Sequence, residues 1–77
     1  MSNRFPRVGV IGAGQLARMM VAPATALGVD LLLFAADAND SGAQVAHHVI
    51  GDYNNLSQVL DFAKRCDVVT FEHELDR

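Results

Sequence analysis

Two stretches of the sequence carry residues whose types and spacing could do chemistry. The first, Gly12-Ala13-Gly14-Gln15-Leu16-Ala17, fits the pattern G-x-G-x-x-[GA]. In this pattern Gly12 permits a tight turn from a strand into a helix, Gly14 lets a ligand approach the backbone, and Ala17 lets the helix pack closely on a sheet. The free N–H groups at the start of such a helix favour a polar or anionic ligand. A turn that merely packs the helix would show the same spacing.

The second stretch, Asp67-Val68-Val69-Thr70-Phe71-Glu72-His73-Glu74, ends in two carboxylates one residue apart. On an extended strand, Glu72 and Glu74 point to the same face. Carboxylates are poor neighbours for a pyrophosphate, but they accept hydrogen bonds well from an amine or from sugar hydroxyls. We therefore expect both glutamates to bind a substrate; the alternative is that both are solvated residues at a strand end.

Alternating apolar runs and helical patterns indicate the elements that must position these residues. They predict an α/β fold, a Rossmann-like parallel sheet of four strands with three crossover helices. The strands are expected at residues 8–11, 29–34, 48–50 and 67–71. The usual strand order of such sheets, 3-2-1-4, places the glycine loop beside Glu72 at the topological switch point, where ligands bind.

The first helix is expected to run from the glycine loop to Gly28. Its apolar face would comprise Leu16, Met20, Pro23 and Leu27. Gly28 should end the helix in the left-handed conformation. Pro23 should bend the helix, because proline removes the hydrogen bond to the carbonyl of Met19. The neighbouring Arg18 is expected at the surface, and Met19 and Met20 in the core.

The other two crossovers are expected to differ in how much helix they contain. Residues 37–46 are long enough only for a loop and two turns of helix. The last helix should begin after Asn54 or Asn55 and should end with Lys64-Arg65 in its last turn. Its core face would comprise Leu56, Val59, Leu60 and Ala63.

Composition argues against several classes of function. The 77 residues carry a net charge of −3 with only six scattered Lys and Arg, which argues against nucleic-acid binding. No apolar run approaches the ~20 residues that span a bilayer, and no signal core is present near the amino end. The one cysteine, Cys66, is expected as a buried thiol in a cytoplasmic protein. Because 51% of so short a chain is hydrophobic, we expect a fragment of a longer protein.

Histidines and one aspartate raise two other possibilities, a metal site and a nicotinamide site. His47, His48 and His73 are not expected to bind a metal, since adjacent residues on a strand point to opposite faces. An NAD(P)-dependent oxidoreductase would share the fold, and it needs an acidic residue at the end of the second strand to hold the ribose hydroxyls. Asp37 is the one candidate, and an ordinary loop aspartate explains it equally well.

The run V-G-V-I-G-A-G-Q-L-A-R-M-M, followed by A-L-G-V, G-D-Y-N-N and C-D-V-V-T-F-E-H-E, resembles the N-terminal domain of the N5-carboxyaminoimidazole ribonucleotide synthetase family, which belongs to the ATP-grasp superfamily. The resemblance covers about Arg7 to Glu74 and depends on G-Q-L-x-R-M-M and D-V-V-T-F-E-x-E. It implies a cytoplasmic ligase of purine biosynthesis. With ATP and bicarbonate, such an enzyme carboxylates the exocyclic amine of 5-aminoimidazole ribonucleotide through carboxyphosphate.

The resemblance also implies which part of such an enzyme this chain is. Residues 1–77 would form the pre-ATP-grasp domain, while ATP, Mg²⁺ and the catalytic residues belong to ATP-grasp and C-terminal domains outside this sequence. The fragment alone would be inactive, and the full-length enzyme a homodimer. The implied substrate-binding residues are Gln15, Leu16 and Glu72, with Gly14 and Glu74 beside them and Gly12 and Ala13 forming the loop. Ala13 departs from the glycine or asparagine that is frequent there.

Two further alternatives stay open at the level of the sequence. A related ATP-grasp enzyme, such as the formate-dependent glycinamide ribonucleotide transformylase, has a first domain of the same plan. A non-catalytic interaction domain is the other alternative for a chain this short.

Overall fold

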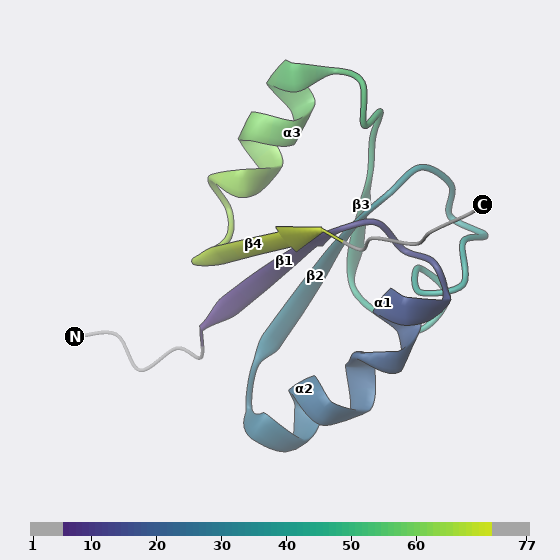
Figure 1. Ribbon diagram of the computed structural model, residues 1–77, viewed down its shortest axis with the longest axis vertical. Coiled ribbons are helices and arrows are strands. Elements are labelled where there is room, and N and C mark those ends of the chain that lie inside the picture. Colours follow the sequence, from purple (N-terminus) through teal and green to yellow (C-terminus); the bar gives the residue numbers. More distant parts are fainter. Residues whose placement is uncertain (1–5, 72–77) are drawn as a thin grey trace.

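A four-stranded parallel sheet forms the centre of the computed structural model, which describes residues 6–71 (Figure 1). The strands are β1 (Arg7–Ile11), β2 (Asp30–Ala35), β3 (His48–Ile50) and β4 (Val68–Phe71). Their order is β3-β2-β1-β4, and Ile11 at the end of β1 pairs with Phe71 at the end of β4. The predicted fold class, strand positions and strand order are confirmed.

The turn that leaves β1 depends on a glycine. Gly12 has a φ of 133°, a backbone conformation that residues with a Cβ rarely adopt. Its N–H donates a hydrogen bond of 2.9 Å to the carbonyl of Phe34, so the turn is tied to the end of β2. Gly12 therefore lies in the turn that leads from β1 toward the first helix.

The first crossover contains two short helices, α1 (Gln15–Met19) and α2 (Val21–Leu27), instead of the one bent helix predicted. The helix is interrupted at Met20, whose N–H donates a hydrogen bond of 3.1 Å to the carbonyl of Ala17. This break places Pro23 in the first turn of α2, where an N–H has no intrahelical partner, so the proline costs no hydrogen bond. Gly28 ends α2 with a φ of 74°, as predicted.

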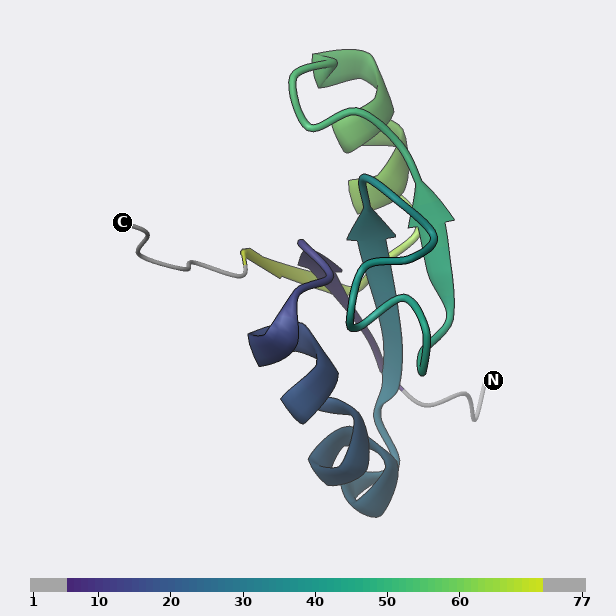
Figure 2. The same ribbon diagram turned by 90° about the vertical axis from the view of Figure 1, so that its right-hand side faces the viewer.

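The sheet is covered on both faces, with α1 and α2 on one side and α3 (Leu56–Ala63) on the other (Figure 2). Under α1 lies a cluster of small and branched residues: Val10, Ala13, Ala17, Leu33, Ala35 and Ala43. Under α3 lies a cluster with two aromatic rings: Ile11, Leu32, Phe34 and Phe62. Met20 packs against the first cluster, whereas Met19 is 63% exposed, so its expected place in the core was wrong.

The face that α3 turns to the sheet differs from the predicted one. Phe62 is its buried residue, and Val59 and Cys66 pack beside it. Leu56 and Leu60, which were expected in the core, are 69% and 51% exposed. The apolar residues of this segment form two overlapping stripes, and the stripe that includes the larger aromatic side chain is the one that packs. Asn55 caps the helix, because its side chain accepts a hydrogen bond of 3.1 Å from the Gln58 N–H.

The crossover from β2 to β3 consists of turns and contains no helix among its described residues. Asp37 accepts a hydrogen bond from the Asn39 N–H at 2.8 Å, and Asp40 accepts one from the Asp37 N–H at 3.1 Å. Side chains that bond nearby backbone in this way compete with helix formation, which explains why the two predicted helical turns are absent. Ala43 and Ala46 still pack on the core and cover the sheet where a helix was expected.

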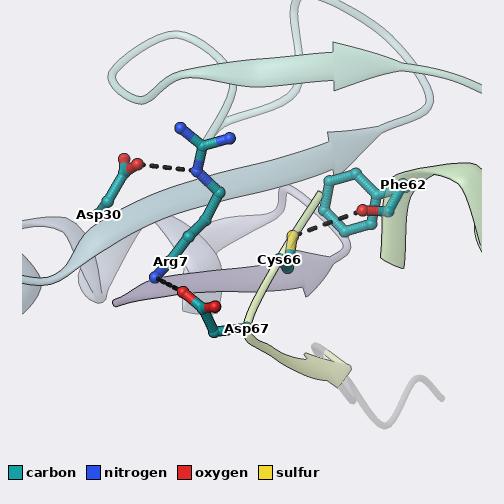
Figure 3. Close-up of polar contacts among 5 residues, drawn as sticks. All are labelled: Arg7, Asp30, Phe62, Cys66 and Asp67. Carbon is teal, nitrogen blue, oxygen red and sulfur yellow. Dashed lines mark hydrogen bonds and ion pairs between the residues drawn. The ribbon is translucent and has the colours of Figure 1, made fainter. Parts of the chain in front are cut away.

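At the amino end of the sheet, Arg7 of β1 contacts Asp30 of β2 and Asp67, which directly precedes β4 (Figure 3). Its guanidinium Nε lies 2.8 Å from the Asp30 carboxylate, and its backbone N–H donates to the Asp67 carboxylate at 2.7 Å. Nearby, the Cys66 thiol donates to the carbonyl of Phe62 at 3.5 Å. Burial raises the pKa of the Cys66 thiol, so it stays protonated at neutral pH and acts as a packing group, half-buried instead of fully buried as expected.

In the part of the chain that the structure describes, no helix is both long enough and apolar enough to reach across a bilayer.

Candidate functional site

A cavity lies at the carboxyl ends of β1, β2 and β4, where the sheet order predicts a ligand site. It has a volume of about 570 Å³. Its walls are mostly apolar, with exposed backbone and few polar groups, which is the usual character of a small-molecule site. The lining residues are Ile11, Gly12, Ala13, Gly14, Ala36, Asp40, Tyr53, Val59 and Phe71.

The glycine loop forms one wall of this cavity through Gly12, Ala13 and Gly14. Ala17, on the first turn of α1, is fully buried against the sheet, as its small size predicted. Gln15 and Leu16 are exposed and lie next to the lining residues without belonging to them. The structure thus brings the loop backbone to the cavity and places the two predicted substrate-binding side chains beside it.

The field of α1 contributes less to this site than the sequence pattern suggests. The helix has only five residues, its N-cap is Gly14, and no side chain caps it. Because a helix dipole is the sum of aligned peptide dipoles, so short a helix offers little positive charge to an anion. The small size of Gly14 in the cavity wall, and not the helix end, is the feature that suits a ligand here.

The loop after β2 is fastened to the glycine loop by polar contacts. The Ser41 hydroxyl donates a hydrogen bond of 3.1 Å to Oε1 of Gln15, and Arg18 Nη1 donates to the Ser41 carbonyl at 3.3 Å. The Gly42 N–H donates to the carbonyl of Ala13. Arg18 therefore lies at the surface, as predicted, but it holds the neighbouring loop.

Asp37, the candidate acidic residue of the nicotinamide alternative, is an ordinary loop aspartate in the structure. Asp37 lies outside the cavity, and its carboxylate accepts from the backbone of its own turn. Ala36, which follows the end of β2, occupies the place where a dinucleotide-binding enzyme needs an acidic residue. The geometry therefore gives the nicotinamide alternative no acidic group at the end of β2. Among residues 6–71, Asp40 is the carboxylate that lines the cavity.

Two aromatic residues at the cavity were missed by the sequence analysis. Tyr53 follows β3, and its ring lies 5.7 Å from that of Phe34 between centroids, at an interplanar angle of 46°. Phe71 is the last residue of β4. Both follow or end strands whose carboxyl ends meet at this edge, so the rule that located the glycine loop could have found them.

The remaining predicted residues divide between described and undescribed parts of the chain. Glu72, His73 and Glu74 lie outside the described residues, although Phe71, directly before them, lines the cavity. The Nδ1 atom of His48 lies 3.0 Å from the carbonyl of Ala46. Within residues 6–71, no group of three or more His, Cys, Asp or Glu side chains could hold a metal ion.

In sequence, the chain is similar to ribonucleotide synthetases. The profile described as "Ribonucleotide synthetase preATP-grasp domain" matches residues 5–75. The chain is 47% identical over 71 residues to N5-carboxyaminoimidazole ribonucleotide synthase of Corynebacterium ammoniagenes. The matched segment covers 91% of this chain and 17% of that relative.

Two crystal structures are similar in fold and sequence. N5-carboxyaminoimidazole ribonucleotide synthetase of Thermotoga maritima superposes with a TM-score of 0.81 and 26% identity, over 90% of this chain and 20% of that one. The ADP complex of the Staphylococcus aureus enzyme superposes with a TM-score of 0.80 and 28% identity, over 90% of this chain and 19% of that one. The chain spans a fifth or less of the length of these proteins.

Proposed function

Because the chain belongs to the ribonucleotide synthetase preATP-grasp domain family, we propose that it is the substrate-binding N-terminal part of an N5-carboxyaminoimidazole ribonucleotide synthetase. The observation that carries the proposal is the family match across residues 5–75, which includes the whole glycine loop and the end of β4. The cavity between these two segments supports the proposal, because it was located in this structure alone and not by comparison with a relative.

The proposed reaction needs the longer enzyme of which this chain would form a part. Bicarbonate takes the γ-phosphoryl group of ATP, which forms carboxyphosphate and releases ADP. The exocyclic amine of 5-aminoimidazole ribonucleotide then attacks the carboxyl carbon, phosphate leaves, and the amine loses a proton. The ADP complex of the Staphylococcus aureus relative supports the use of ATP. We place Mg²⁺, like ATP, in the other domains of that longer enzyme. We also propose a cytoplasmic enzyme that acts as a homodimer.

This chain would bind and orient the ribonucleotide. Gly14 lines the cavity and adds no side chain to its wall, and Gln15 and Leu16 flank it. Glu72 and Glu74 follow Phe71 in the sequence, and their carboxylates would accept hydrogen bonds from the amine or from ribose hydroxyls. No residue of the chain is proposed to be catalytic.

Phosphate release tests the proposed function directly. We expect the full-length enzyme to hydrolyse ATP only when 5-aminoimidazole ribonucleotide and bicarbonate are both present, and the 77 residues alone to release none. Each component is omitted in turn. Turnover that requires formate and glycinamide ribonucleotide instead would assign the chain to the related transformylases, and turnover by the 77 residues alone would contradict the assigned role.

Replacing Glu72 by Gln in the full-length enzyme should lower kcat/KM for the ribonucleotide about tenfold. The change keeps the shape of the side chain and turns a charge-assisted hydrogen bond, worth roughly 1.5–3 kcal/mol, into a neutral one worth about 1 kcal/mol. The KM for ATP should stay unchanged, because ATP binds in another domain. Steady-state kinetics with each substrate varied in turn will measure both effects.

The Glu74→Gln variant is the matched control for this experiment. It removes the same charge two positions further along the chain. If only the overall negative charge of this segment mattered, both variants would weaken use of the ribonucleotide equally. Unaltered ribonucleotide kinetics in Glu72→Gln would show that this carboxylate is a solvated strand-end group.

A further inference from the structure

We propose that Ser41 is a positioning residue for the substrate, acting through Gln15; the inference rests on the proposed function. Its hydroxyl donates a hydrogen bond of 3.1 Å to Oε1 of Gln15. Gln15 is the first residue of α1, directly after the Gly14 backbone that lines the cavity. Gln15 is exposed at the start of a five-residue helix, and among the described residues this hydrogen bond is the polar contact that orients its side-chain amide.

The bond also decides which end of the amide is presented. A serine hydroxyl that donates to Oε1 engages the acceptor end of the side chain. Within residues 6–71, the Gln15 amide nitrogen contacts no acceptor, so its two N–H donors are available to a ligand. The oxygen atoms of a ribonucleotide are acceptors of the kind that such donors bind.

Ser41 can orient Gln15 because its own backbone is fixed from both sides. Arg18 Nη1 donates to the Ser41 carbonyl at 3.3 Å, and the Gly42 N–H donates to the carbonyl of Ala13. A Cβ at position 42 would lie 2.8 Å from Leu33 Cδ1 and 3.1 Å from the Ala13 carbonyl oxygen, so only glycine lets the loop approach this closely. Next to it, Ala43 is buried in the core. The hydroxyl is therefore held by the fold and is not a freely moving surface group.

The effect expected from this arrangement is on binding and not on chemistry. Without the Ser41 hydroxyl, the Gln15 amide loses its fixed orientation in the free enzyme and in the transition state alike. Such a loss raises KM and leaves kcat unchanged. In the full-length enzyme, Ser41→Ala should raise KM for 5-aminoimidazole ribonucleotide about fivefold, the factor typical of one neutral hydrogen bond. The KM for ATP should not change.

Three further variants separate positioning from a merely structural role. Ser41→Thr keeps the hydroxyl and should restore KM to within about twofold of the wild-type value. Ser41→Ala made in a Gln15→Ala background should have no further effect, because the residue through which it acts is gone. Ser57→Ala, which removes an exposed hydroxyl from the first turn of α3, is the matched control and should leave all constants unchanged.

The outcomes distinguish this inference from the function on which it rests. A wild-type enzyme whose ATP turnover does not depend on the ribonucleotide would overturn both. In an enzyme that shows this dependence, wild-type kinetics for Ser41→Ala would overturn the inference alone. So would an equal loss for Ser41→Ala with and without Gln15, or a fall in kcat at constant KM.

Discussion

Replacing Phe62 by alanine is expected to lower the free energy of unfolding by about 3–5 kcal/mol, the usual cost of removing a buried aromatic ring. Phe62 is 2% exposed and is the buried residue of α3. Its ring lies 5.2 Å from that of Phe34 between centroids, so the variant loses an aromatic pair as well as buried area. The cavity left behind lies under a single helix, which has no second buried side chain to fill it.

Leu60→Ala provides the control for the Phe62 variant. Leu60 belongs to the same helix but is half-exposed, so its truncation removes little buried area and slightly favours helix formation. Urea unfolding followed by far-ultraviolet circular dichroism will compare the two variants. Because small domains have total stabilities of about 5–15 kcal/mol, Phe62→Ala should lose most of its cooperative transition. Equal losses in both variants would mean that α3 packs as the sequence pattern predicted and not as the structure shows.

Gly9→Ala is expected to destabilise the protein by about 1–3 kcal/mol, although alanine usually stabilises an extended segment relative to glycine. Gly9 lies in β1, where it pairs with Leu32 of β2 and Val69 of β4. A Cβ at this position would overlap the Cys66 sulfur and would lie 2.9 Å from Cε2 of Phe62. The absence of a side chain is what lets α3 approach the sheet, so the added methyl group must displace the helix.

A double-mutant cycle with Cys66→Ala tests the cause of this loss. Removing the sulfur takes away the nearest obstacle to the new methyl group, while the contact with Phe62 stays. The double variant should therefore be more stable than the sum of the single losses implies, by an amount that urea titration can resolve. Strictly additive losses would show that Gly9 is needed for its backbone conformation and not for the space it leaves.

The sheet was predictable because one physical signal dominates at each of its parts. Short apolar runs marked the strands, and Gly28 marked the end of the first crossover, where a left-handed residue is needed. The glycine loop was equally clear, since a strand preceded it and a helical pattern followed. The strand order was predictable because it follows from the usual connections of such sheets, and it indicated the edge of the sheet at which the cavity lies.

The errors arose where two local signals competed. In the first crossover the helical pattern continued through Met20. Pro23, however, is tolerated only in the first turn of a helix, so one helix ends and a second begins before it. In α3 two stripes overlapped, and the periodicity alone did not show that Phe62 would pack in preference to Leu60. Proline geometry decided between the alternatives in the first crossover, and tertiary packing decided between them in α3.

The candidate site was predictable in position and less so in composition. Gly12 and Gly14 were found from their spacing, whereas Asp40, Tyr53 and Phe71 reach the cavity through loop geometry and strand length. The contact of Ser41 with Gln15 joins residues 26 positions apart, and no local pattern signals such a pair. The roles of Glu72 and Glu74 stay predictions, since both lie outside the described residues.

The strand order has a consequence for how the molecule assembles as it is synthesised. Strand β1 is made first, yet its pairing with β4 joins segments 60 positions apart, as in the contact of the Arg7 N–H with Asp67. Closing so long a loop lowers the entropy of the chain before the contacts between β1 and β4 can stabilise the fold. Until β4 has emerged from the ribosome, the strand that ends up central in the sheet has one unpaired edge, and in that interval it is open to pairing with the wrong chain.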